Sequence, residues 1–200
     1  SSVGETSGGV NLNLLSKDLD EGMEILREVL TEPRFQQDRL DLLKKQSLSS
    51  MKQRNDDSRG IEGRNRLRLG YGENFFRNRM TTKASVESLT RADLQQFHRD
   101  WFHPANFVVA VSGDFERAEM IARLEKLFAK WPFQGKKAPA IPTNKTIAKP
   151  GIYFLHKPVN QGRVSVILPG VKRDNPDYYA IAVMNDILGG GGFTSRITNR

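Results

Sequence analysis

The sequence predicts an α+β fold in which long helices pack against an antiparallel sheet. Apolar residues recur every three to four positions in long segments such as residues 18–32 and 116–131, which is typical of amphipathic helices. Shorter runs with a period of two, at residues 10–14 and 106–112, are typical of strands. Long helices interspersed with short strands favour a layer of helices on a sheet.

Capping residues and prolines mark where the helices begin and end. Asp18 with Glu21, and Thr90 with Asp93, have the spacing of a capping box. Pro33 ends the first helix, because proline cannot continue one. From these signals we expect helices at residues 18–32, 35–55, 90–102 and 116–131, and a helix followed by a loop within 59–80.

The last quarter of the chain predicts two strands and one helix. The strands are expected at residues 152–156 and 163–168. A helix over residues 178–188 follows, and the glycines at 189–192 close it. These glycines follow a helix and not a strand, so a helix-ending turn is favoured over a phosphate-binding loop.

The composition changes at a proline-rich stretch that predicts a linker between two domains. We expect residues 1–132 to be the later part of a first α+β domain, 133–149 the linker, and 150–200 the start of a second, similar domain. Two strands and one helix cannot enclose a core, so the second domain is expected to be truncated. Its exposed strand edges should favour self-association.

Composition and charge exclude several classes of protein. The 200 residues include no cysteine, which excludes disulfide frameworks, thiolate zinc sites and cysteine nucleophiles. No apolar run approaches the roughly 18 residues of a membrane span. The 31 basic against 23 acidic residues give a net charge of +8, which favours acidic partners. Six arginines within residues 59–79 leave a basic nucleic-acid-binding module as one alternative, although a charged helix face is more often simply solvated.

The three histidines do not have the spacing of a metal site. His98 and His103 are five residues apart, whereas two ligands on one helix face are three or four apart. His156 lies far along the chain, and no G-x-S-x-G motif is present. A structural or solvated role is therefore favoured for all three.

Three sequence motifs resemble those of the pitrilysin/insulinase family of zinc metallopeptidases, which includes the mitochondrial processing peptidase. Residues 100–115, DWFHPANFVVAVSGDF, resemble the family's helix end, P-x-N turn, strand and G-D turn, and residues 19–35 resemble its helix and P-x-F turn. Residues 189–196 resemble its G-G-x-x-S-R turn. The motif residues are Pro104, Asn106, Gly113, Asp114, Gly189, Gly190, Ser195 and Arg196.

The resemblance implies a fold and an architecture. It implies a LuxS/metallohydrolase-like layer of antiparallel sheet packed with long helices, repeated in two similar domains that clamp a peptide between them. It also suggests a bacterial periplasmic or cell-envelope location. The motif residues themselves are expected to hold turns, and no catalytic residue is assigned to this chain.

The resemblance further predicts that the chain lacks a zinc ligand. Active members bind zinc through an H-x-x-E-H motif and a later glutamate, which follows the phenylalanine of P-x-F by fifteen residues. Counting from Phe35 places Ser50 at the ligand position, and Leu43 where a second acidic residue is expected. No glutamate lies between Glu32 and Glu62. No metal site is therefore expected in this chain, and zinc is expected in active relatives or in a partner subunit.

Taken together, the residues and the resemblance predict a segment of a pitrilysin-type peptidase, of the non-catalytic kind. Such a subunit binds peptide or unfolded polypeptide and pairs with a homologous zinc-bearing chain. The arginine and tyrosine that zinc-less subunits contribute would lie beyond Arg200, so Arg196 is not given that role. The alternative is an active zinc metalloendopeptidase with H-x-x-E-H upstream of residue 1. Whether the whole protein is an enzyme is left open, and this segment is expected to be inactive.

Overall fold

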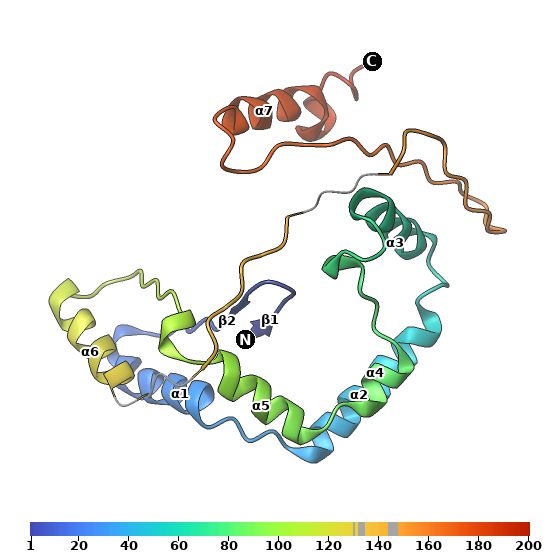
Figure 1. The fold of residues 1–200 in the computed structure, drawn as a ribbon. Coiled ribbons are helices and arrows are strands. Elements are labelled where there is room, and N and C mark those ends of the chain that lie inside the picture. Colours follow the sequence, from blue (N-terminus) through green and yellow to red (C-terminus); the bar gives the residue numbers. More distant parts are fainter. Residues whose placement is uncertain (130, 132–134, 144–147) are drawn as a thin grey trace.

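A computed structural model describes residues 1–129, 131, 135–143 and 148–200. Helices dominate the described chain (Figure 1). The α-helices are α1 (Leu19–Thr31), α2 (Gln37–Gln53), α3 (Ser58–Tyr71), α4 (Lys83–Ser88), α5 (Arg91–Trp101), α6 (Arg117–Ala129) and α7 (Tyr178–Asn185). Single 3-10 turns are η1 (Ser16–Asp18), η2 (Phe76–Asn78), η3 (Pro104–Asn106) and η5 (Gly192–Thr194), and a π-turn, η4 (Asp186–Gly190), follows α7.

The predicted helices are present, and side-chain caps explain the first residues of α3, α4 and α5. Thr90 and Asp93 form the expected capping box of α5, since the Asp93 carboxylate accepts from the Thr90 amide at 2.8 Å and the Thr90 hydroxyl accepts from the Asp93 amide at 3.2 Å. The predicted box at Asp18 is wrong, because its side chain makes no capping hydrogen bond to α1. Asp57 caps α3, because its side chain accepts from the Arg59 and Gly60 amides.

The sheet of the predicted α+β layer is not formed in the described part of the chain. The one ladder among the described residues pairs β1 (Ser2–Val3) with β2 (Gly8–Gly9) in antiparallel fashion. A strand is stable only when its backbone groups are paired by a neighbour, and apolar alternation alone does not supply one. The four segments expected as strands, residues 10–14, 106–112, 152–156 and 163–168, therefore run without ladder hydrogen bonds.

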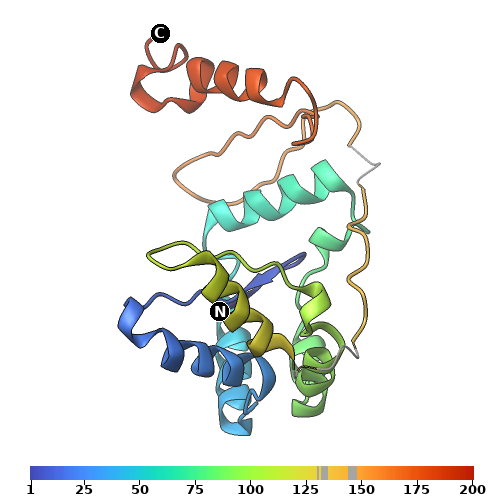
Figure 2. The ribbon, with the colours of Figure 1, turned by 90° about the vertical axis from the view of Figure 1, so that its left-hand side faces the viewer.

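The helices follow an arc that runs from α6 and α1 through α5 to α2 and α4 (Figures 1 and 2). Helix α3 and the C-terminal segment lie beyond α2 and α4. Helices α2 and α4 contact each other, and the Lys44 ammonium donates to the Glu87 carbonyl at 3.0 Å. The buried apolar side chains are few and come from separate helices. They are Leu30, Leu40, Val86 and Met120.

The proline-rich segment crosses from the end of α5 to α3. At its start the Lys136 amide donates to the Asp100 carbonyl at 2.6 Å. Near its end the Ala148 amide donates to the Leu69 carbonyl of α3 at 3.0 Å. Much of the predicted linker, residues 133, 134 and 144–147, lies outside the described residues. The described ends of this segment are thus tied to two different helices.

Candidate functional site

The position expected for the later zinc ligand lies in the second half of α2. Ser50 is exposed there, and Leu43, two turns earlier on the same side of the helix, is 59% exposed. A serine hydroxyl and an isobutyl group offer none of the carboxylate oxygens that zinc takes from such a helix.

The nearby acidic residues do not replace the missing carboxylate. Asp41, two turns and more before Ser50, accepts a hydrogen bond from the Gln37 side-chain amide at 2.9 Å within the same helix. Among the residues that the structure describes, no three His, Cys, Asp or Glu side chains lie close enough together to hold a metal ion. The donor set around Ser50 therefore does not fit zinc.

His98 joins two helices of the fold. Nε2 of His98, on α5, lies 2.7 Å from the Leu30 carbonyl at the end of α1. A carbonyl oxygen only accepts, so this nitrogen carries a proton. The His98 ring also stacks on Phe102 with centroids 5.1 Å apart and meets the Phe35 ring edge to face.

The P-x-F turn between α1 and α2 has an unusual backbone. Phe35 has φ of 44°, in the left-handed region that non-glycine residues rarely adopt. The ring contact with His98 and a 3.2 Å hydrogen bond from Arg91 to the Arg34 carbonyl hold this turn against α5. The motif therefore fixes the start of α2 relative to α5.

The P-x-N motif forms a buried polar clamp. His103 is 2% exposed, Pro104 opens the turn η3, and Asn106 ends it. The Asn106 side-chain nitrogen donates to the carbonyls of Trp101 at 3.1 Å and Lys136 at 3.0 Å. Its side-chain oxygen accepts from the Ala138 amide at 3.3 Å. One asparagine thus joins the end of α5 to the start of the proline-rich segment.

An ion pair reinforces this clamp at the surface. The Lys136 ammonium lies 2.8 Å from an Asp100 carboxylate oxygen, and the Gln96 amide donates to the other oxygen at 2.8 Å. The hydrogen bond from Lys136, and secondarily the one from Gln96, lowers the pKa of Asp100 below its ordinary 3.8.

The remaining motif residues lie in two separate turns. Gly113 has φ of 145°, which disfavours any side chain, and the Asp114 carbonyl accepts from the Ser16 hydroxyl at 3.4 Å. This turn joins the segment before α6 to the start of α1.

The G-G-x-x-S-R motif closes a loop on the end of α7. The Arg196 amide donates to the Ile187 carbonyl at 3.0 Å, and the Ser195 side chain is 1% exposed with its hydroxyl 2.9 Å from that of Thr198. Gly189 and Gly190 lie in the π-turn that begins this loop, while Arg196 itself is exposed. These residues therefore lie in the turns that follow α7.

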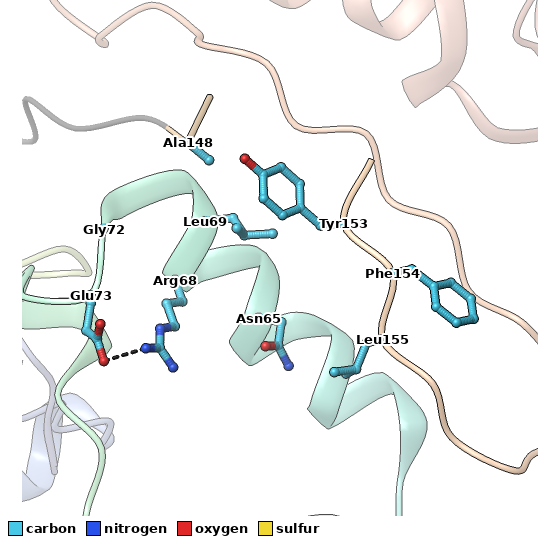
Figure 3. Close-up of a pocket in the computed structure, with 9 residues that line it drawn as sticks. All are labelled: Asn65, Arg68, Leu69, Gly72, Glu73, Ala148, Tyr153, Phe154 and Leu155. Atoms are coloured by element: carbon cyan, nitrogen blue, oxygen red, sulfur yellow. Dashed lines mark hydrogen bonds and ion pairs between the residues drawn. The ribbon is translucent and has the colours of Figure 1, made fainter. Parts of the chain in front are cut away.

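A pocket between α3 and the segment after the linker was not anticipated from the sequence. It has a volume of about 420 Å³, and Leu69, Tyr153 and Leu155 give it apolar walls (Figure 3). Arg68 and Glu73 form an ion pair at its rim. In the sequence, the alternation of residues at 152–156 is the pattern that could have indicated this pocket, because one side of that segment faces α3.

Three of the six arginines within residues 59–79 form ion pairs with acidic side chains. Arg66 pairs with Glu62 at 3.2 Å, Arg68 with Glu73, and Arg77 with Glu5 at 3.7 Å. Paired arginines offer less free charge to a phosphate backbone than their number suggests.

Among the described residues, no helix has the length and apolarity needed to cross a bilayer.

The described chain is thus a largely helical domain whose turns carry the motifs of the family resemblance. A family model described as the peptidase M16 inactive domain matches residues 88–200. The chain belongs to this family. The resemblance seen in the sequence motifs is thereby confirmed.

The relatives include proteins named as peptidases and one named as a non-peptidase homologue. The chain is 26% identical, over 92% of its length, to an uncharacterized zinc protease of Mycobacterium leprae, and 28% identical, over 96%, to a non-peptidase homologue of Helicobacter pylori. It is 21% identical, over 88%, to a probable mitochondrial-processing peptidase subunit beta of Arabidopsis thaliana. It spans 42%, 44% and 34% of these three proteins.

A solved structure supports the fold. The crystal structure of a peptidase M16 inactive domain from Pseudomonas fluorescens matches with a TM-score of 0.67 and 24% identity. The match covers 92% of this chain and 44% of that one. At this identity the match establishes the arrangement of the chain and nothing about its ligands.

Proposed function

We propose that this chain is a non-catalytic part of an M16-type peptidase, which binds peptide and works with a homologous zinc-bearing chain. The observation that carries the proposal is Ser50, an exposed hydroxyl on α2 where active relatives of this kind need a glutamate. With two of three protein ligands at most, a zinc ion would be weakly held and poorly placed to polarise a peptide carbonyl.

The peptide would lie along residues 152–156 and use the pocket on α3. An extended peptide gains affinity by pairing with unpaired backbone, and specificity by placing alternate side chains in pockets. Leu69, Tyr153 and Leu155 would receive an apolar side chain, and the Arg68–Glu73 pair at the rim would contact polar neighbours. The site favours an unfolded segment with an isolated large apolar residue.

Zinc would come from the partner. One relative is named as a subunit of a processing peptidase, which supports an assembly of more than one chain. In such an assembly this chain supplies a wall of the chamber, and the partner supplies the metal and the general base. No catalytic step is assigned to a residue of this chain.

Metal analysis of the intact natural protein tests the non-catalytic role. We expect substoichiometric zinc and no chelator-sensitive peptidase activity. Stoichiometric zinc that a chelator removes together with activity would overturn the proposal.

Peptide binding is tested separately by fluorescence anisotropy with a labelled, extended apolar peptide. Leu69→Asp, which places a charge in the pocket, should weaken binding at least tenfold. Leu67→Asp, on the same helix at a 38% exposed position outside the pocket lining, is the matched control and should bind as the parent does. Equal affinity for all three proteins would show that the peptide does not bind in this pocket.

A second candidate is an active zinc peptidase whose ligands lie outside this segment. It is favoured by the relatives named as zinc proteases, among them that of Mycobacterium leprae. The same metal analysis separates the two, because the active enzyme requires one tightly bound zinc per chain.

A further inference from the structure

Two arginines in the first two turns of α3 form no ion pair within the described part of the chain. They are Arg59 and Arg64, whereas Arg66 and Arg68 on the same helix are each balanced by a glutamate. Arg64 donates to the side-chain oxygen of Asn55 at 2.6 Å. An amide oxygen is neutral, so this bond orients the guanidinium without cancelling its charge.

Two cations from the segment after the linker reach the same end of α3. Lys157 donates to the Asn55 carbonyl, and Arg163 donates to the Ser58 hydroxyl at 3.0 Å. Asn55 precedes α3 by three residues and Ser58 opens it, so both contacts bring the two cations to the start of the helix. Among the described residues, neither cation forms an ion pair. We call the four side chains the cationic cluster. It comprises Arg59, Arg64, Lys157 and Arg163.

Two carboxylates accompany the cationic cluster. Asp57 is turned toward the helix backbone, because its oxygens accept from the amides of Arg59 and Gly60 at 3.1 Å each. These hydrogen bonds, followed by the charges of Arg163 and Arg59, lower the pKa of Asp57 below its ordinary 3.8. Asp56 is exposed beside it. Four cations against two carboxylates leave a net positive charge at this end of α3.

The cationic cluster lies a few residues of extended chain away from the α3 pocket. Figure 3 shows Tyr153 beside Leu69, and the segment continues from there to Lys157 at the turn before α3. Leu69 and Arg64 are separated by about 7 Å of helix, and Tyr153 and Lys157 by about 13 Å of extended chain. A peptide lying alongside covers these distances with about two to four residues.

We propose that the cationic cluster is a carboxylate-binding subsite, which takes an acidic side chain of the peptide held by the α3 pocket. The proposal rests on the proposed function and names its substrate class. That class is an extended polypeptide with Asp or Glu about two to four residues from a large apolar residue.

The side chains of the cationic cluster have donors left for such a carboxylate. Arg64, Lys157 and Arg163 each use one N–H group on a neutral oxygen, and guanidinium and ammonium groups have several. Hydrogen bonds from a cation to a carboxylate are stronger than those between neutral groups. The apolar pocket beside the cluster favours a peptide over a nucleic acid, whose phosphates would require free cations along the whole of α3.

The test compares two labelled, extended peptides by fluorescence anisotropy. Both carry a single leucine, and they differ only in having Glu or Gln three residues to each side of it. At low salt the Glu peptide should bind about fivefold more tightly, because exposed charge pairs contribute modestly. Salt should reduce this advantage while the Gln peptide stays bound, since salt screens charge but not apolar burial. A third peptide, with Glu directly beside the leucine, should lack the advantage.

Charge-removing variants show whether the cationic cluster is responsible. Lys157→Gln and Arg163→Gln should each bring the ratio of the two affinities close to one. Lys126→Gln and Arg117→Gln are the matched controls, because they remove the same charge from exposed positions on α6, far from α3 (Figure 1). Both controls should keep the parent's ratio. A ratio that falls equally in the controls would come from net charge and would overturn the proposal.

The outcomes separate this proposal from the proposed function. Equal affinity of the parent for the Glu and Gln peptides, with binding still weakened by Leu69→Asp, would overturn the carboxylate subsite and leave the pocket in place. Failure of both peptides to bind would overturn the two together. Tighter binding of a labelled single-stranded DNA than of the Glu peptide would overturn the proposal in favour of a nucleic-acid site.

Discussion

Nε2 of His103 lies 3.0 Å from the carbonyl oxygen of Lys136, 33 residues further along the chain. The side-chain nitrogen of Asn106 also lies 3.0 Å from this Nε2, so the tautomer of the His103 ring decides which of the two groups Nε2 bonds to. The same oxygen accepts from Asn106, and the His103 ring is almost completely buried. The clamp between the P-x-N turn and the proline-rich segment therefore includes a buried histidine side chain.

Gly135→Ala should destabilise the clamp. A Cβ at Gly135 would overlap the His103 ring and lie 2.7 Å from the Asp100 carbonyl, and neither group can move without breaking a hydrogen bond. We expect a loss of about 1–3 kcal/mol in the free energy of unfolding, measured by urea denaturation. Gly162→Ala, where no atom lies within 4 Å, is the control and should change stability little. Equal effects would show that the close approach is unimportant.

Asn106→Ala should be destabilising for a different reason. It removes two donated hydrogen bonds and leaves the Ala138 amide without its acceptor. A part-buried network broken in this way costs about 1–3 kcal/mol, which the same denaturation experiment measures. Asn11→Ala, at an exposed position, is the control. An Asn106 variant as stable as the Asn11 variant would contradict a structural role for the P-x-N motif.

The pKa of Asp100 predicts an acid-sensitive contribution to stability. Because its pKa in the folded chain is lowered below 3.8, Asp100 stabilises the fold fully above that value. The contribution is lost as the pH falls below 3.8 and through the lowered pKa, since the protonated carboxyl no longer pairs with Lys136.

Asp100→Asn should therefore reduce stability at neutral pH and flatten its decline in acid. Denaturation midpoints between neutral pH and pH 3 measure both effects. Asp114→Asn, at an exposed carboxylate outside this ion pair, should keep the parent's profile. An Asp100→Asn profile parallel to that of the parent would refute the assignment.

The two glycines of the C-terminal motif should differ in their tolerance of a side chain. A Cβ on Gly190 would lie 2.8 Å from the Asn185 side-chain nitrogen and 3.2 Å from its carbonyl oxygen, whereas one on Gly189 would lie 3.5 Å from Ile197 in ordinary contact. Gly190→Ala should therefore loosen the turn, and Gly189→Ala should not. Hydrogen exchange at the Arg196 and Ile197 amides, which donate across the loop, is the readout. Faster exchange in the Gly189 variant would reverse the expectation.

Local signals in the sequence predicted the helices well and the sheet poorly. The Thr90–Asp93 box placed the start of α5 correctly, because the capping atoms are three residues apart and need no distant partner. The segment 106–112 has the composition of a strand, yet only a neighbouring strand could have made it one. The Asp18–Glu21 pattern failed for a related reason, since spacing permits a cap without forming it.

The candidate site likewise has features that the sequence alone predicts and features that depend on contacts between distant residues. Residue type and position alone place a serine where the family resemblance expects a carboxylate ligand, and no packing can give that side chain a second oxygen. The sequence by itself also determined the family motifs and the lack of cysteine.

Only the tertiary structure decided which distant groups meet. It joined Asn106 to Lys136, placed Tyr153 and Leu155 against Leu69, and turned Phe154 outward. Contacts between residues far apart in the chain depend on how whole helices pack, and the period-two pattern says that two faces differ without saying which one is covered.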